Sequence, residues 1–236
     1  MATVDLFKKI VAYTPAATDL DHIPIIIYNN PQIPSRVDAI LDGKENPVTE
    51  LMRTARRLEN AGADFIIIPC HTAHVWFSEI QAAIQIPIYS MIENTVSCIE
   101  VHYRHLSDRI LLLGTKAILQ KRLYQNAFEQ KGLKLHVPES YEQDMVASAI
   151  LEVKGSLIEK NSYIVPLNQM LNQYYASGVT AVLGACTEIP LLFPYLDLKI
   201  EKLDPTLMLA NMAIVLAIKD NSKAGDDNDR IESNPC

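Results

Sequence analysis

The sequence predicts an α/β fold built from two similar lobes, each a parallel sheet flanked by helices, with a site in the cleft between them. Short aliphatic runs alternate along the chain with amphipathic segments of about 10–15 residues, which is typical of parallel strands joined by helical crossovers. A second observation is a repeated pattern, an aliphatic run followed by a cysteine. Cys70 comes after the run Ile66 to Ile68, and Cys186 comes after the run Ala181 to Leu183. Ligands bind at the carboxyl ends of parallel strands, so both cysteines are expected at one cleft.

The individual elements follow from hydrophobic periodicity and from turn residues such as Gly62 and Gly132. Strands are expected at residues 22–29, 64–68, 86–89, 109–113, 133–136, 181–183 and 200–203. Helices are expected at residues 3–13, 48–60, 75–85, 92–105, 116–130, 141–153, 163–175 and 206–218. Residues 30–36 are too rich in proline to be regular, and the polar, acidic residues 220–236 are expected to be disordered.

The composition favours a small-molecule partner. The net charge of −7 and the absence of a Lys/Arg block argue against nucleic acid and against an anionic membrane surface. The apolar runs are far shorter than the roughly 20 residues of a membrane span, and no secretory leader opens the chain. We therefore expect a cytoplasmic protein that binds neither nucleic acid nor membrane.

The two strand-end cysteines suggest proton transfer. A thiol beside the amino end of a helix meets unpaired N–H groups and a positive dipole, which favour the thiolate. Two such groups on opposite walls of a cleft could act as base and acid on the two faces of one carbon, with Cys70 and Cys186 in these roles. Because the chain shows no Gly-rich nucleotide loop and no obvious pyridoxal lysine, the pattern predicts racemisation or epimerisation without a cofactor.

The neighbouring polar residues suit a carboxylate substrate. The hydroxyls of Thr72, Thr115 and Thr187, with backbone N–H groups, could stabilise charge developing on a substrate carboxylate. Arg36 could bind a second carboxylate in a bidentate manner.

Each of these residues also has a structural alternative. A strand-end cysteine is often a small buried hydrophobe, and Cys98, inside an amphipathic helix, is expected in the core. Arg36 would then brace its loop, and the two threonines beside the cysteines would be helix caps. Glu188 would complement a helix dipole, and Lys154 would be a surface residue. A metal site at Cys70-His71-x-x-His74 lacks a second ligand pair at the usual spacing, so no metal is expected.

Two motifs carry a resemblance to a known family. Residues 69–74 (Pro-Cys-His-Thr-Ala-His) and 184–191 (Gly-Ala-Cys-Thr-Glu-Ile-Pro-Leu) resemble the aspartate/glutamate racemase family, and within it the aspartate racemases most closely. The resemblance covers about residues 2–218 and is supported by residues 2–7, 30–36, 112–115 and 152–155.

The resemblance implies two pseudosymmetric lobes, with residues 1–97 plus 206–219 in the first and 98–205 in the second. It also implies a homodimer and cofactor-independent catalysis in which Cys70 and Cys186 form the base pair. The residues that fall on or beside the family's substrate-site positions are Asn30, Arg36, His71, Thr72, Thr115, Lys154, Thr187 and Glu188.

This chain departs from the family pattern in two places. His71 stands where the family usually has asparagine, so the hold on the substrate is expected to differ. The family also has a first strand and a Gly-rich loop ahead of the segment that starts here at Ala2-Thr3, and we expect the first lobe to lack them.

The sequence therefore predicts an isomerase, a racemase of aspartate that needs no pyridoxal phosphate. Glutamate racemase or a broad-specificity amino-acid racemase is the second hypothesis. Hydantoin racemase and maleate isomerase, other members of the wider superfamily, are weaker alternatives. From other classes, a binding protein that holds carboxylates without turnover and a redox or zinc protein remain alternatives.

Overall fold

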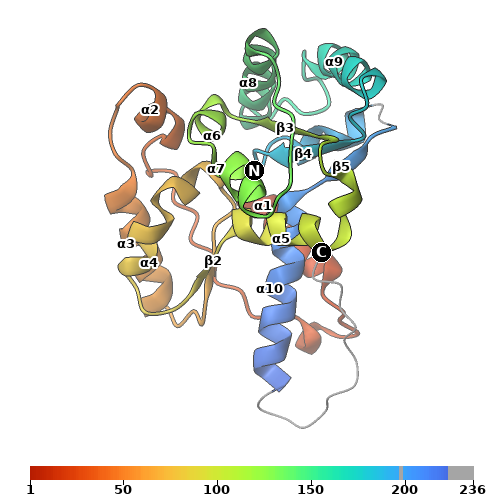
Figure 1. The fold of residues 1–236 in the computed structure, drawn as a ribbon. Coiled ribbons are helices and arrows are strands. Elements are labelled where there is room, and N and C mark those ends of the chain that lie inside the picture. Colours follow the sequence, from red (N-terminus) through yellow and green to blue (C-terminus); the bar gives the residue numbers. More distant parts are fainter. Residues whose placement is uncertain (197–198, 223–236) are drawn as a thin grey trace.

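A computed structural model describes residues 1–196 and 199–222 and shows two parallel sheets with helices packed on them (Figure 1). This is the α/β architecture that the sequence predicts. None of the helices in these residues is both long enough and apolar enough to cross a lipid bilayer.

The larger sheet has the strand order β3-β4-β5, with β3 at Ile110–Gly114, β4 at Ala181–Ala185 and β5 at Glu201–Leu203, all parallel. Every residue of β3 and β4 is buried, which explains why both strands are aliphatic throughout. Successive side chains alternate between the two faces. Leu111 and Leu113 pack against helices α8 (Ser140–Lys154) and α9 (Ile164–Ala176), and Ile110 and Leu112 pack against α5 (Met91–His102) and α7 (Leu123–Gln130).

The smaller sheet contains two short parallel strands among the described residues, β1 (Ile66–Ile67) and β2 (Ile88–Tyr89). Its core is formed with α3 (Val48–Asn60), α4 (Phe77–Ala82) and the 3-10 helix η2 (His71–Trp76). The bounds of α3 are those predicted, because its apolar face follows a regular helical period.

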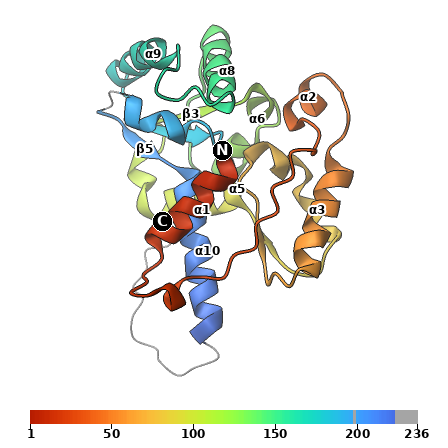
Figure 2. The same ribbon diagram turned by 180° about the vertical axis from the view of Figure 1, so that it is seen from behind.

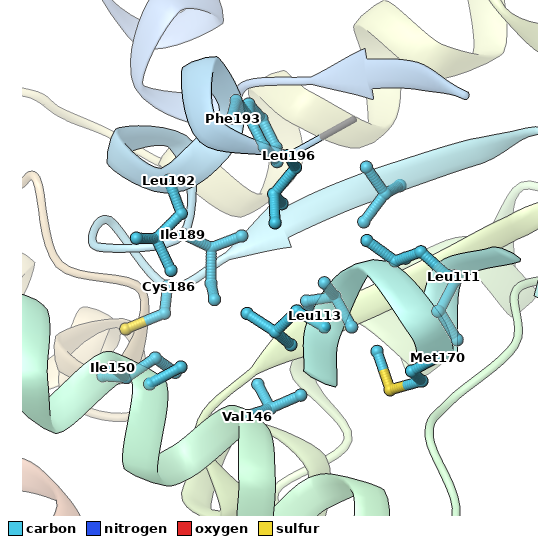
Figure 3. Close-up of a cluster of buried hydrophobic side chains, with 14 of the residues drawn as sticks. Leu111, Leu113, Val146, Ile150, Met170, Cys186, Ile189, Leu192, Phe193 and Leu196 are labelled. Atoms are coloured by element: carbon cyan, nitrogen blue, oxygen red, sulfur yellow. The ribbon is translucent and has the colours of Figure 1, made fainter. Parts of the chain in front are cut away.

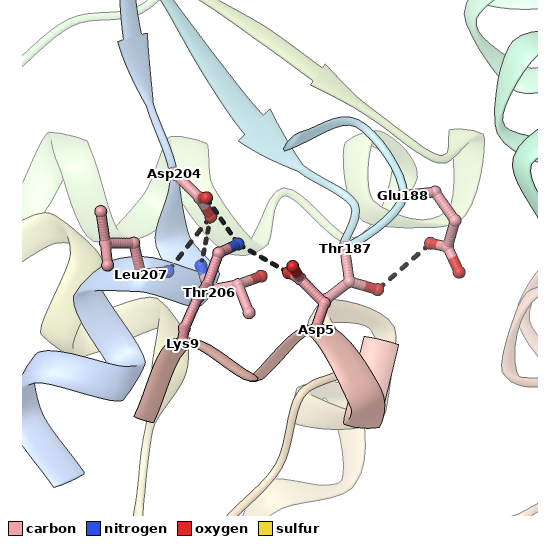
Figure 4. Close-up of polar contacts among 7 residues, drawn as sticks. All are labelled: Asp5, Lys9, Thr187, Glu188, Asp204, Thr206 and Leu207. Atoms are coloured by element: carbon pink, nitrogen blue, oxygen red, sulfur yellow. Dashed lines mark hydrogen bonds and ion pairs between the residues drawn. The ribbon is translucent and has the colours of Figure 1, made fainter. Parts of the chain in front are cut away.

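The first and last helices of the described residues, α1 (Ala2–Tyr13) and α10 (Pro205–Ser222), lie side by side, and α10 also packs on α5 (Figures 1 and 2). Lys9 joins them, because its Nζ lies 2.6 Å from Asp5 Oδ2 and 2.7 Å from Asp204 Oδ2 (Figure 4). Asp204 also caps α10, since its Oδ1 accepts the backbone N–H groups of Thr206 and Leu207 (Figure 4).

Two predicted strands are wrong. Residues 22–29 form no strand, and the side chains of Ile26 and Ile27 are 47% and 45% exposed. A β-branched run becomes a strand only where a neighbouring strand supplies hydrogen-bond partners, and none of the strands in the described residues pairs with this segment. Residues 133–136 contribute only an isolated bridge between His136 and Leu111.

Several helices differ from the prediction in their bounds. The helix expected at 116–130 is divided into α6 (Lys116–Gln120) and α7, because Arg122 has a left-handed backbone with φ of 52°. The helix expected at 75–85 is η2 followed by α4. Residues 30–35 are irregular as expected, and a helix that was not predicted, α2 (Arg36–Leu41), begins after the N-cap Ser35. The remaining elements are the 3-10 helices η1 (Asp19–Asp21), η3 (Arg104–Leu106) and η4 (Pro190–Tyr195).

The predicted acidic tail lies, from residue 223 onward, outside the described residues. The lobe boundaries at 97/98 and 205/206 stay a prediction.

Candidate active site

A cavity of about 320 Å³ lies at the carboxyl ends of β1, β3 and β4. It is lined by segments that follow strands of both sheets, by α2 and by the end of α8, as the crevice rule for parallel sheets leads us to expect. The predicted site residues that line it are Arg36, Cys70, His71, Thr72, Thr115, Lys154, Cys186, Thr187 and Glu188.

Asn30 is the predicted site residue that the structure places elsewhere. Its Nδ2 donates to Glu50 Oε1 at 2.8 Å and to Thr54 Oγ1 at 3.1 Å, so its side chain faces α3. It lines an adjoining cavity of about 360 Å³, which shares Arg36 and Cys70 with the first.

Cys186 is a buried free thiol directly after β4. Its sulfur lies at the edge of an apolar cluster that includes Ile150 and Ile189 (Figure 3). Cys186 Sγ donates to Glu188 Oε2 at 2.9 Å, and Thr187 Oγ1 donates to the same oxygen at 3.1 Å (Figure 4 shows the second bond). Burial and the charge of Glu188 raise the pKa of Cys186 well above its ordinary value, against the opposing pull of Lys154. Cys186 is therefore a protonated thiol at neutral pH.

The raised pKa of Cys186 favours the thiol over the thiolate, and the secondary structure helps to explain why. Neither cysteine is followed by a regular α-helix: η2 comes after Cys70 and η4 comes shortly after Cys186. Such short 3-10 turns carry little of the dipole that a long α-helix has. At Cys186, burial and then the neighbouring carboxylate of Glu188 favour the protonated thiol instead.

Cys70 is a half-buried free thiol, and His74 positions the backbone of its loop. His74 Nδ1 lies 2.9 Å from the Cys70 carbonyl oxygen, and the N–H of Met91 donates to His74 Nε2 at 3.0 Å. These partners define a neutral ring protonated at Nδ1, and burial lowers the pKa of His74 to about 4. Because both ring nitrogens are occupied, His74 ties the Cys70 loop to the start of α5 and has no lone pair left for a metal.

His71 lies against helix α7. Its side chain is 2% exposed, and its Nδ1 lies 3.0 Å from the hydroxyl oxygen of Tyr124. Burial lowers the pKa of His71 to about 3, so the ring is neutral. Tyr124 is fully buried, and burial raises the pKa of its hydroxyl. The sequence pattern marks Tyr124 only as an apolar position of a helix, so sequence reasoning missed this contact.

Two cations border the cavity. Arg36 Nη1 donates to the carbonyls of Ile33 and Pro34 at 3.2 and 3.1 Å. This nitrogen of the guanidinium therefore stabilises the loop, as the structural alternative expected. Lys154, at the end of α8, is exposed and near enough to Cys186 to affect the pKa of that thiol. Thr115 caps α6 by accepting the Ile118 N–H at 3.3 Å, which leaves its hydroxyl proton available for a ligand.

Comparison with known proteins follows this geometry. Residues 1–213 match the model of the Asp/Glu/Hydantoin racemase family. The chain belongs to that family. The broad specificity amino-acid racemase RacX of Bacillus subtilis is 25% identical over 219 residues, which cover 90% of this chain and 92% of that protein. The glutamate racemase of Helicobacter pylori strain G27 is 32% identical over 132 residues, so the match spans about half of that protein (48%).

Solved structures of the family share the fold. The aspartate racemase of Picrophilus torridus is 29% identical, with a TM-score of 0.80 over 92% of this chain and 89% of that one. An aspartate racemase homologue from Pyrococcus horikoshii has a TM-score of 0.70 at 24% identity over 92% of this chain and 94% of that one, which is a similarity of fold. The family predicted from the two cysteine motifs is confirmed.

Proposed function

We propose that the protein is a cofactor-independent amino-acid racemase that interconverts L- and D-aspartate by proton transfer at Cα. The observation that carries the proposal is that two free thiols, Cys70 from the smaller sheet and Cys186 from the larger, line one cavity in a chain of the racemase family. One thiol on each side of a substrate carbon is the arrangement that inversion requires.

In the proposed reaction, Cys70 as a thiolate removes the proton from Cα, and the C–H electron pair passes into the α-carboxylate. The Cys186 thiol then donates its proton to the opposite face of Cα, which inverts the centre. The product state carries a thiol at Cys70 and a thiolate at Cys186, which is the form that acts on the opposite enantiomer. In this proposal the hydroxyls of Thr72 and Thr115, which border the cavity, stabilise the carboxylate charge, whereas the Thr187 hydroxyl donates to Glu188.

A dicarboxylate is the substrate that fits the charges. Arg36 and Lys154 supply two cations at one cavity, whereas Glu188, the acid there, is engaged with Cys186 and Thr187. Aspartate pairs one carboxylate with each cation. The alignment over 89% of the Picrophilus torridus aspartate racemase supports this choice. The full-length similarity to RacX makes a broad-specificity amino-acid racemase the second candidate.

The first experiment is proton NMR of L-aspartate, and separately of D-aspartate, with the purified protein in heavy water. Loss of the α-proton signal from both enantiomers is expected, with the opposite enantiomer accumulating. A folded protein that leaves both signals intact contradicts the proposal, and heat of aspartate binding without exchange then identifies a binding protein. Parallel runs with glutamate and with neutral amino acids separate aspartate specificity from the broader activity.

Single-cysteine variants sharpen this test, because each is the control for the other. Cys70→Ser and Cys186→Ser should each lower racemisation by about 10³-fold or more, since one proton donor or acceptor is lost. Each variant should retain α-proton exchange from one enantiomer only, and the retained enantiomer should differ between them. Undiminished racemisation in either variant would remove the cysteine pair from the mechanism.

A further inference from the structure

The adjoining cavity of about 360 Å³ begins where the first cavity ends. The residues that line both cavities are Ala2, Ile33, Arg36, Pro69 and Cys70. Because Cys70 borders both, a chain attached to a carbon beside its sulfur can extend from the first cavity into the second. Protein cores contain few voids larger than a water molecule, whereas ligand pockets start at about 300 Å³. The second cavity therefore has the size of a ligand subsite.

The inner wall of the second cavity is aliphatic. Helix α3 contributes Leu51, Ala55 and Leu58, which are spaced i, i+4 and i+7 and so share one helical face. Ile66 of β1 and Ile80 of α4 complete this wall, and both side chains are buried. Ala55, at the centre of the α3 face, carries only a methyl group. The wall is consequently hollow at this position.

Two polar side chains that line the second cavity already have partners. Asn30 Nδ2 donates to Glu50 and to Thr54, so the amide faces α3. The Tyr28 hydroxyl is hydrogen-bonded to Arg57, whose guanidinium carbon lies over the Tyr28 ring at 5.1 Å from its centroid. A polar ligand group against the aliphatic wall would lose its hydration without gaining a partner, whereas an apolar group gains by burial there.

We infer that the second cavity receives the side chain of a second class of substrate, the amino acids with long apolar side chains such as leucine, methionine and phenylalanine. The inference rests on the proposed function, which it deepens by adding this class to aspartate. Cα of the substrate stays between Cys70 and Cys186, so the α-proton still leaves to one thiolate and the other thiol returns a proton. The single carboxylate of such a substrate needs only one of the two cations, Arg36 and Lys154.

A substrate series in heavy water tests the inference in the wild-type protein. Proton NMR follows α-proton exchange with leucine, methionine and phenylalanine, and with alanine, whose methyl group is too short to fill the second cavity. Burial of the longer side chain should raise kcat/KM about 10- to 100-fold over alanine. Exchange of alanine that is as fast as that of all three longer amino acids overturns the inference.

A cavity-filling variant supplies the second test. Ala55→Leu adds volume to the second cavity alone, because Ala55 does not line the first. The ratio of kcat/KM for methionine to kcat/KM for aspartate should fall about tenfold or more. The control Ala82→Leu adds the same side chain at an exposed position of α4 that borders neither cavity, and it should keep the wild-type ratio.

An unchanged ratio in Ala55→Leu overturns the inference. If Ala55→Leu does not fold, the substrate series with the wild-type protein still decides between the two outcomes.

A binding measurement separates the inference from the proposed function. The probe is 4-methylpentanoate, which has the side chain and carboxylate of leucine but no ammonium group. Calorimetry should show that it binds the wild-type protein and binds Ala55→Leu at least tenfold more weakly, with a several-fold smaller loss for succinate.

The two proposals then fail in different ways. Exchange of aspartate without exchange of any long apolar amino acid overturns the second substrate class and leaves the racemase proposal in place. Binding of 4-methylpentanoate that weakens in Ala55→Leu, without α-proton exchange of any amino acid, supports the apolar subsite and contradicts the racemase proposal.

Discussion

Cys186 follows a strand that is hydrogen-bonded on both sides, by β3 and β5, whereas Cys70 follows a strand that pairs, in the described part of the chain, with β2 alone. The Cys186 side is continuous with the apolar core around α8 and α9 (Figure 3). The loop that carries Cys70 is held by two buried histidines, His74 and His71, which form hydrogen bonds with α5 and α7 respectively.

This difference shows that the same sequence pattern, a cysteine after a short aliphatic strand, can be positioned by two kinds of interaction. A backbone ladder with aliphatic packing places Cys186, and it is insensitive to pH. Polar side-chain contacts place the Cys70 loop, and they depend on which histidine nitrogens carry protons. The thiol environments differ as well, because burial and the charge of Glu188 raise the pKa of Cys186.

The largest expected difference concerns the two sheets. Leu112→Ala, at a fully buried position of β3, should lower the free energy of unfolding by about 3–5 kcal/mol. Ile67→Ala, at a half-buried position of β1, is the matched variant and should cost about 1–2 kcal/mol, since less apolar area is lost. Urea unfolding measures both, and equal losses would remove the contrast between the sheets.

The next effect concerns the carboxylate of Glu188, which accepts a hydrogen bond from Cys186. Glu188→Gln should lower kcat/KM by about 10²-fold, or about 2.7 kcal/mol, because the charged acceptor that holds the Cys186 thiol is lost. The loss should be equal for both enantiomers, since the equilibrium constant between mirror images is one. Removing the negative charge should also lower the pKa of Cys186 and move the alkaline limb of the pH–rate profile to lower pH.

Glu159→Gln is the control for this variant, because Glu159 pairs with Tyr195 away from the cavity and should leave the rate unchanged. An alkaline limb that does not move in Glu188→Gln would mean that Glu188 does not govern the thiol.

A smaller effect is expected for His74, which links the Cys70 loop to α5 by hydrogen bonds. His74→Phe keeps an aromatic ring but leaves the Met91 N–H unpaired and removes one of the two donors to the Cys70 carbonyl, and it should cost about 2 kcal/mol of stability. His102→Phe, at an exposed position of α5, should stay within about 0.5 kcal/mol of wild type. Thermal and urea unfolding compare the two, and similar losses would show that His74 does not act through its hydrogen bonds.

The smallest effect is a pH slope. His71 and His74 have pKa values of about 3 and 4 in the folded protein, below the ordinary 6.5. The unfolded chain therefore binds more protons below pH 6.5, and stability is complete above that pH and falls as the pH drops toward 4. Each histidine contributes up to about 1.4 kcal/mol per pH unit. Urea unfolding between about pH 7 and 5 should show a shallower slope in His71→Asn than in wild type, and parallel slopes would contradict the buried neutral state of His71.

The sequence determined the features that depend on local patterns. Alternating aliphatic and amphipathic segments were enough to predict the α/β class, the bounds of α3 at residues 48–60, and the placement of each cysteine after a strand, of which β4 is fully buried and β1 only in part. Periodicity records which side of an element faces the core, and this holds whatever the neighbour is. The two cysteine motifs also predicted the family that the comparisons confirm.

The tertiary structure decided everything that needs a specific partner. Residues 22–29 have strand propensity and still form no strand, because pairing depends on a neighbour that no local pattern specifies. Tyr124 lies 53 positions from His71, so their contact is invisible in either segment. Glu188 lies two residues from Cys186, but the sequence does not show where its side chain points. In the folded chain its carboxylate accepts a hydrogen bond from the Cys186 thiol rather than complementing a helix dipole. Protonation states follow from burial and from hydrogen-bond partners, and these are properties of the folded chain.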